Sequence, residues 1–240
     1  MTSATTPAPV EAKASVWEDF LDIFYSPREV FARRMDGKFG LALLVLVIIS
    51  AVLTYASMQA MEPVYTAEVD RQMAAQSAEM TPEQMSAARS FGGVMMLVFA
   101  VVGLPIMVML TGLTLWLVGK LFDSVQTLGQ GLMVATYAQF PRVLLGLLLM
   151  TIQGFLMDLS TADRIYDVTF SAARFAGDGT SELMLVMLSR LDVFIIWTTV
   201  LLGIGLHVTG KIPKSKAMIA AFIVWALGAL PAVLGALRAS

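Results

Sequence analysis

Arg142 is the residue of this sequence with the clearest chemical potential, because it follows Pro141 within a long apolar run. An arginine at the centre of a bilayer costs about 2.5–3.5 kcal/mol on insertion scales, and such residues usually face a cavity or a partner. Together with Tyr137, Gln139 and Gln153 on the same run, Arg142 forms a candidate intramembrane polar site. Alternatively, Arg142 lies near the membrane surface and extends its side chain to the lipid headgroups. Both interpretations are open at this point.

Two further ionisable residues mark the ends of a second apolar run. Asp192 stands at its start, two positions after Arg190, and His207 stands near its end. Residues two apart point to different faces of a helix, so Arg190 and Asp192 are not expected to form a relay. We interpret Asp192 and His207 as interface anchors, and we favour a capping or headgroup role for His207 over proton transfer.

The remaining residues offer little catalytic chemistry. The chain has no Cys and one His, which excludes thiolate and multi-histidine metal sites and cysteine nucleophiles. It contains no Gly-x-Ser-x-Gly, His-Glu-x-x-His or phosphate-binding Gly-rich Lys motif. Its 16 basic and 18 acidic residues give no basic excess for nucleic acid. We therefore expect no cofactor, no nucleic-acid partner and no enzymatic activity.

The composition indicates that these residues are carried by membrane-spanning helices. Of the 240 residues, 58% are apolar and 14% charged, whereas soluble domains average about 45–50% and about 25%. Crossing a bilayer as a helix takes about 20 mostly apolar residues. Five runs qualify, at residues 39–61, 91–118, 132–157, 191–209 and 217–237. We predict an all-α polytopic integral membrane protein whose transmembrane domain covers residues 39–237.

The distribution of Lys and Arg predicts the orientation of these spans. Nine of them lie before the first span and in the second and fourth connections, against five in the first and third connections and after the last span. Because positive residues favour the cytoplasmic side, the N-terminus is expected in the cytoplasm and the C-terminus outside. The first span follows a long polar segment without a cleavage site, so we expect it to be retained.

Before the first span, residues 1–15 are expected to be a disordered tail and residues 16–38 to form amphipathic, juxtamembrane helices. One interpretation is a cytoplasmic face that binds a partner or lipid headgroups. The other is that these helices pack on their own bundle. The face in question consists of Trp17, Phe20, Phe24, Arg33 and Arg34.

The connections and the last span carry further patterns. We expect one surface helix within residues 62–90 and a short helix around residues 161–175. Small residues follow one stripe of the last span and predict close helix packing, within the bundle or between copies. This packing face consists of Ala217, Ala221, Gly228 and Ala232.

Several short motifs resemble those of the Yip family, the Ypt/Rab-interacting membrane proteins, in its bacterial branch. They are residues 24–31 (FYSPREVF), 137–141 (YAQFP), 192–197 (DVFIIW), 203–206 (GIGL) and 209–211 (TGK). The resemblance implies five spans, a cytoplasmic N-terminus and, for this branch, the bacterial cytoplasmic membrane. Eukaryotic members are thought to bind Rab-type GTPases and to organise vesicle transport, but the short inward loops here leave little surface for a GTPase.

Two functions follow from these patterns. The first is a non-catalytic multi-pass membrane protein of Yip-like type that organises membranes or binds a partner or lipid. Its partners would be the bilayer and a membrane protein or a second copy of the chain. The alternative is a small transporter or channel with Arg142 as the charge at its site.

Overall fold

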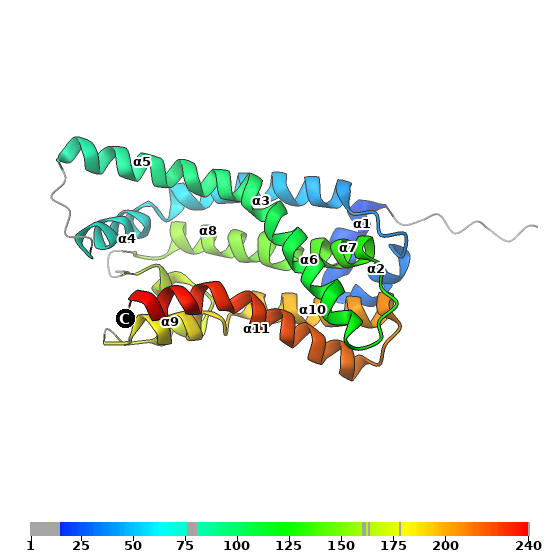
Figure 1. Ribbon diagram of the computed structural model, residues 1–240. Coiled ribbons are helices and arrows are strands. Elements are labelled where there is room, and N and C mark those ends of the chain that lie inside the picture. Colours follow the sequence, from blue (N-terminus) through cyan, green and yellow to red (C-terminus); the bar gives the residue numbers. More distant parts are fainter. Residues whose placement is uncertain (1–14, 76–80, 160–161, 163, 178, 240) are drawn as a thin grey trace, which may run out of the picture.

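Five helices of the chain are long and apolar enough to cross a membrane, as the sequence predicts (Figure 1). This computed structural model describes residues 15–75, 81–159, 162, 164–177 and 179–239. Two of the five, Ser86–Lys120 and Leu128–Leu156, are composite. The predicted disordered tail lies outside the described residues, apart from Ser15. The spans are α3 (Gly40–Ala60); α5 (Pro82–Val98), η1 (Phe99–Gly103) and α6 (Leu104–Lys120); α7 (Leu128–Ala138), η2 (Arg142–Gly146) and α8 (Leu147–Leu156); α10 (Val193–Gly210); and α11 (Lys214–Ala239).

Side-chain caps define where several of these helices begin. Thr81 and Thr127 each accept a hydrogen bond from the backbone N–H three residues on, where a glutamine reaches back to the backbone N–H of the capping residue. Asp192 caps α10 in a similar way, by accepting from two backbone N–H groups. Such caps satisfy donors that the first turn of a helix leaves unpaired.

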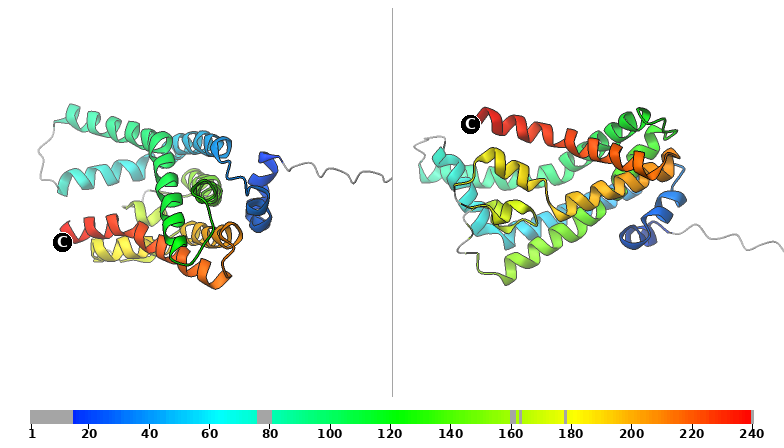
Figure 2. Two further views of the ribbon diagram at one scale, coloured as in Figure 1. Left: turned by 45° about the vertical axis from the view of Figure 1, so that its right-hand side comes forward. Right: turned by 90° about the horizontal axis from the view of Figure 1, so that it is seen from below.

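The two ends of the bundle differ in what covers them (Figures 1 and 2). At one end, which we call the hairpin end, lie the short helices α1 (Val16–Tyr25) and α2 (Pro27–Arg33) and the turns that precede α7 and α11. At the other, the far end, lie α4 (Glu62–Ala75), α9 (Glu182–Ser189) and the C-terminus. The described residues therefore begin and end at opposite ends of the bundle.

Glycines bring the spans close together at their crossings. A Cβ atom at Gly154 of α8 would lie 2.6 Å from the backbone oxygen of Ala60 at the end of α3. A Cβ atom at Gly112 of α6 would lie 2.8 Å from Cα of Leu132 on α7. Real Cβ atoms do not approach other atoms so closely, so these crossings require glycine.

The third connection differs from the prediction. The helix expected around residues 161–175 was wrong for the described part of this segment, which forms two 3₁₀ turns, Ile165–Val168 and Ala172–Phe175. Between them the backbone pairs with the chain ahead of α10: Ala172 N–H donates to Leu191, and Val193 N–H to Phe170. Extended pairing of this kind replaces helical hydrogen bonds. The α9 helix was not predicted; it begins after Ser181, whose side chain accepts a hydrogen bond from the backbone N–H of Met184.

Candidate functional site

A cavity of about 890 Å³ lies among the spans. It is bounded by α3, by the α5–η1–α6 span, by the middle of the α7–η2–α8 span and by the start of α10, and the segment around residues 165–171 covers it at the far end. Its size is within the range of about 300–1,000 Å³ that is usual for small-molecule sites. Its size therefore suits a small-molecule ligand.

Two π-helical segments form part of the cavity wall. The η1 segment contributes Phe99 and Ala100, and the η2 segment contributes Arg142, Val143 and Gly146. Each adjoins a proline, since Pro105 follows η1 and Pro141 precedes η2. Proline removes a backbone donor and clashes with the preceding turn, so a helix near it widens or bends. π-turns of this kind are frequently found at functional sites.

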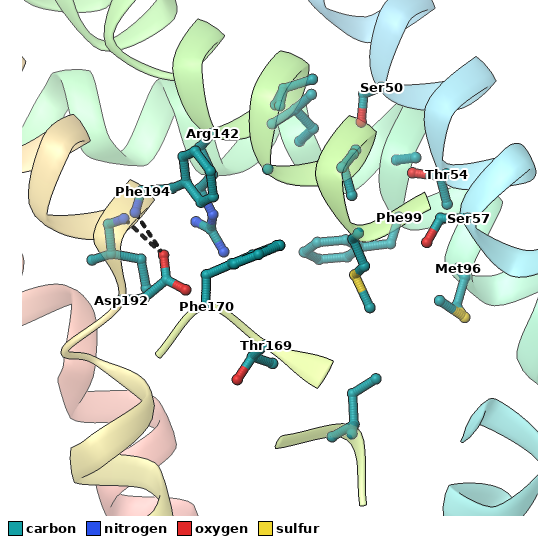
Figure 3. Close-up of a pocket in the computed structure, with 18 of the residues that line it drawn as sticks. Ser50, Thr54, Ser57, Met96, Phe99, Arg142, Thr169, Phe170, Asp192 and Phe194 are labelled. Atoms are coloured by element: carbon teal, nitrogen blue, oxygen red, sulfur yellow. Dashed lines mark hydrogen bonds between the residues drawn. The ribbon is translucent and has the colours of Figure 1, made fainter. Parts of the chain in front are cut away.

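Arg142 lies at the midpoint of its span and faces the cavity. It is 14 residues from either end of Leu128–Leu156, or about 21 Å along the axis at 1.5 Å per residue. Figure 3 shows the side chain extending into the cavity toward Phe170 and Asp192. Among the described residues Arg142 has neither a hydrogen bond nor an ion pair.

The other charged groups of the cavity are engaged by the protein. Asp192 accepts hydrogen bonds on one carboxylate oxygen from the backbone N–H groups of Phe194 (2.9 Å) and Ile195 (3.1 Å) (Figure 3). Arg190 donates to the backbone oxygen of Trp225 (3.2 Å) and lies over its ring, 5.8 Å from the centroid. Among the described residues of the cavity, Arg142 is thus the charged group without a hydrogen bond, while Arg190 keeps an unpaired Nε.

The α3 helix adds a row of hydroxyl groups that the sequence analysis missed. Ser50, Thr54 and Ser57 are all buried and line the cavity (Figure 3). Their i, i+4, i+7 spacing places them on one helical face, and this spacing is the signal that could have revealed them. Ser57 Oγ lies 3.4 Å from the hydroxyl of Tyr65, and burial raises the pKa of Tyr65, so that this hydroxyl stays protonated.

The structure brings together two of the four residues grouped as a candidate polar site. Gln139 and Arg142 line the cavity. Tyr137 does not, because it is two positions from Gln139 and so faces another side of the helix, against α1. Gln153 lies about three helical turns beyond Arg142. Its side chain donates to the backbone oxygen of Val168 (3.1 Å) and accepts from Arg174 (3.1 Å).

The N-terminal helices pack on their own bundle. Phe20 of α1 stacks on Phe140, with ring centroids 4.3 Å apart, and Phe24 meets Trp197 of α10 edge to face at 5.7 Å. The packing brings the segments around residues 24–31, 137–141 and 192–197 together. Of the five residues proposed as a partner or lipid face, Trp17 is 68% exposed, whereas Phe20 is buried.

A buried carboxylate holds α1 and α2 together. Asp19 is fully buried and pairs with Arg33 (2.9 Å) and Arg34 (2.5 Å), which occupies both arginines of the proposed face. The hydroxyl of Tyr137 donates to the same carboxylate at 3.4 Å. At the edge of this cluster, Asp22 accepts hydrogen bonds from the hydroxyl of Tyr25 and from Arg33. These hydrogen bonds hold the pKa of Asp22 below its usual value.

The remaining candidate residues lie in structural positions. Asp192 caps α10, and Nδ1 of His207 lies 2.7 Å from the backbone oxygen of Ile212 in the turn after that helix. In the stripe of small residues, Ala217 and Ala221 are fully buried, whereas Gly228 and Ala232 are exposed. In the part of the chain that is described, no three His, Cys, Asp or Glu side chains are grouped so as to hold a metal ion.

Comparisons with known proteins place this architecture in a family. The Yip1 domain matches residues 21–235, which includes four spans in full, the fifth up to residue 235, and half of α1. A similar protein is "Membrane protein YknW" of Bacillus subtilis (strain 168), 30% identical over 145 residues. The aligned part is 60% of this chain and 58% of that protein, so the chain spans less than two thirds of this relative. No solved structure matches. The chain belongs to the Yip1 domain family of multi-pass membrane proteins.

Proposed function

We propose that this protein is a non-catalytic membrane component that binds an anionic ligand in the cavity between its spans. The observation that carries this proposal is the position of Arg142, which faces a cavity of about 890 Å³ from the midpoint of its span without a hydrogen bond or ion pair among the described residues. A charge in such a place is costly, so a structure that retains it has a use for it.

The chemistry of the cavity favours an acidic group as the part of the ligand that Arg142 holds. A guanidinium donates two parallel hydrogen bonds to a carboxylate or phosphate, and these bonds are stronger than those between neutral groups. The Gln139 amide and the hydroxyls of Ser50 and Thr54 line the same cavity and can donate to further oxygens of a ligand. Since nothing in this set pairs an acid with a base around a nucleophile, binding is favoured over catalysis.

Mass spectrometry of the intact protein tests this function. The protein would be purified from its own membrane in a nonionic detergent, as wild type and as Arg142→Gln. We expect wild type to carry a bound acidic molecule that Arg142→Gln lacks. Arg28→Gln, which removes an exposed arginine of α2 far from the cavity, is the matched control and should retain the molecule. Absence of a bound mass from wild type, or its retention by Arg142→Gln, would contradict the proposal.

Transport of the ligand is the second candidate function. It is favoured by the two π-helical segments beside Pro105 and Pro141, because both line the cavity at places where a helix can rearrange. A transporter would move an anionic solute into sealed vesicles in an Arg142-dependent way. A binding component would hold its ligand without net flux.

We also propose that the hairpin end faces the cytoplasm of a bacterial cell. The excess of Lys and Arg on that side supports this orientation. Because the chain has no cysteine, single substitutions give clean labels. In intact cells an impermeant thiol reagent should label Glu83→Cys at the start of α5 and should not reach Lys214→Cys before the cells are opened. The reverse pattern would invert the orientation.

A partner within the membrane would find its surface on the last span. Gly228 and Ala232 on the far half of α11 are exposed, so the small-residue stripe leaves room there for a helix of a membrane protein or a second copy. Disulfide crosslinking of Ala232→Cys in membranes should then give a defined crosslinked band. A monomeric band alone would exclude this surface.

A further inference from the structure

The cavity differs sharply between its charged region and the wall formed by the α5–η1–α6 span. That span contributes only apolar or small residues to the cavity. Its lining residues are Gly92, Met95, Met96, Phe99, Ala100, Leu104 and Met107. Methionine side chains are flexible and polarizable, so they adapt to chains of different shape. The cavity thus offers a cation on one side and an adaptable apolar wall on the other, which is the pattern of an amphiphile site.

The same wall is open toward the hydrocarbon side. Phe99 lines the cavity and is 62% exposed, and Met107 lines it and is 47% exposed. Of the five spans this one is the least buried. In its most apolar stretch 11% of the residues are buried inside the bundle, against 50% for the spans that begin at Leu128 and Val193. A molecule dissolved in the bilayer therefore meets this exposed span next to the cavity.

Packed groups cover two sides of the cavity. At the hairpin end, Tyr137 and Phe140 are fully buried, and Phe20 stacks on Phe140. At the far end, the segment around Phe170 covers the cavity and is tied by backbone hydrogen bonds to the residues before α10. Among the described residues, the α5–η1–α6 side offers no comparable cover, since Phe99 and Met107 line the cavity there and are exposed.

Asp192 sets a limit on the ligand's charge but does not exclude an acid. Its carboxylate lines the cavity near Arg142 and would repel an anion, but its charge is held at the start of α10 by two backbone N–H groups. A helix N-terminus stabilises a negative charge in this position. Arg190 also lines the cavity and adds a second positive charge to its border.

We propose that the ligand is a single-chain amphiphile that the protein takes from the bilayer and whose acidic headgroup is a carboxylate or a phosphate. This proposal rests on the proposed function. It enters through the α5–η1–α6 wall, sets its headgroup on Arg142 and lays its chain against Met96 and Phe99. A cavity of about 890 Å³ suits one chain better than two.

Photo-crosslinking in phosphatidylcholine vesicles tests this proposal with the full-length protein. The probes are palmitic acid that carries a diazirine in its chain, the lysophosphatidic acid of the same chain, and the matched long-chain alcohol. We expect one or both acidic probes to label residues 92–107, and the alcohol to label them about 10- to 100-fold less, because it lacks a charge-assisted hydrogen bond to Arg142. The stronger of the two acidic probes identifies the headgroup.

Two pairs of variants locate the site. Arg142→Gln should lower labelling by the acids to the level of the alcohol, while Arg28→Gln leaves it unchanged. Met96→Trp, which fills the apolar wall, should reduce labelling several-fold. Met109→Trp, on a methionine that is exposed but does not line the cavity, should not. Equal labelling by acid and alcohol, or no effect of Met96→Trp, would overturn the proposal.

A separate binding experiment distinguishes the two proposals. Acetate and inorganic phosphate are titrated into the detergent-purified protein. If either binds in an Arg142-dependent way while the amphiphiles fail to label residues 92–107, the anion site stands and the bilayer-derived ligand is wrong. If neither the soluble anions nor the amphiphiles depend on Arg142, both proposals fall.

Discussion

Replacing Asp19 with asparagine tests how the N-terminal helices are held on the bundle. The change keeps the size of the side chain and removes its charge, in a place that is fully buried. It weakens the pairs to Arg33 (2.9 Å) and Arg34 (2.5 Å) and the contact with the Tyr137 hydroxyl (3.4 Å). The α1–α2 hairpin is therefore expected to undock more readily while the five spans stay folded.

The size of the effect follows from the partners that remain. A hydrogen bond to a charged group contributes about 1.5–3 kcal/mol. The two losses do not add in full, because Arg33 keeps its pair with Asp22 and both arginine side chains are partly exposed, by 31% and 17%. We expect undocking to become easier by about 1.5–3 kcal/mol, which is a factor of about 10–100 in the population of the undocked state.

Hydrogen exchange followed by mass spectrometry measures this population. Amides in residues 16–34 of Asp19→Asn should exchange about 10- to 100-fold faster than in wild type, and those of α10 should be unchanged. Glu29→Gln, on an exposed carboxylate of α2, is the matched control. Unchanged exchange in residues 16–34 would refute the role of Asp19. Equal acceleration in α10 would show that the hairpin is not a separate unit.

Three further predictions concern stability. Arg142→Leu should raise the thermal unfolding midpoint of the ligand-free protein, because it removes a charge that costs about 2.5–3.5 kcal/mol at the midpoint of a span. Gly154→Ala should lower the free energy of unfolding by about 1–3 kcal/mol, since its Cβ would lie 2.6 Å from a backbone oxygen of Ala60, whereas Gly235→Ala, with open space around it, should have little effect. Docking of the α1–α2 hairpin should weaken as the pH falls below 3.8. Hydrogen bonds from the Tyr25 hydroxyl and, to a smaller extent, from Arg33 hold the pKa of Asp22 below that value. The stability that these bonds contribute is therefore present above pH 3.8 and is lost as the pH falls through the folded-state pKa of Asp22.

Each of these three predictions has its own contradictory result. A lower midpoint for Arg142→Leu would mean that the guanidinium has a protein partner that stabilises the fold. Equal effects of the two glycine substitutions in chemical denaturation would mean that α8 does not cross α3 closely. Radical footprinting measures how exposed residues 16–34 are at neutral and at acid pH. If their exposure does not change with the protonation of Asp22, the hydrogen bonds to Asp22 do not hold the hairpin.

The spans and their order could be predicted from sequence because each is a run of about 20 apolar residues with a clear physical requirement. The same holds for local signals: the amphipathic pattern of residues 16–38 predicted the short helices before the first span, and Phe20 and Ile23 of α1 are buried. These features depend on residues that are close in sequence. Their interpretation needs no knowledge of the bundle.

The candidate site could be predicted only in part. The type of Arg142 and its place after Pro141 showed that it was unusual, but its direction depends on a π-turn and on α10, some fifty residues later, which brings Asp192 beside it. Phe20 and Asp19 likewise each contact a residue more than a hundred positions away, Phe140 and Tyr137. Such contacts are set by tertiary packing, which apolar runs of similar composition do not encode locally.

The most direct test of the cavity as a binding site is an experimental structure of the protein in lipid nanodiscs prepared from its own membrane. We expect elongated density in the cavity, with its head within hydrogen-bond distance of Arg142 and its tail along the α5–η1–α6 span. An empty cavity with the Arg142 side chain paired to a protein carboxylate or turned to the headgroups would contradict the account.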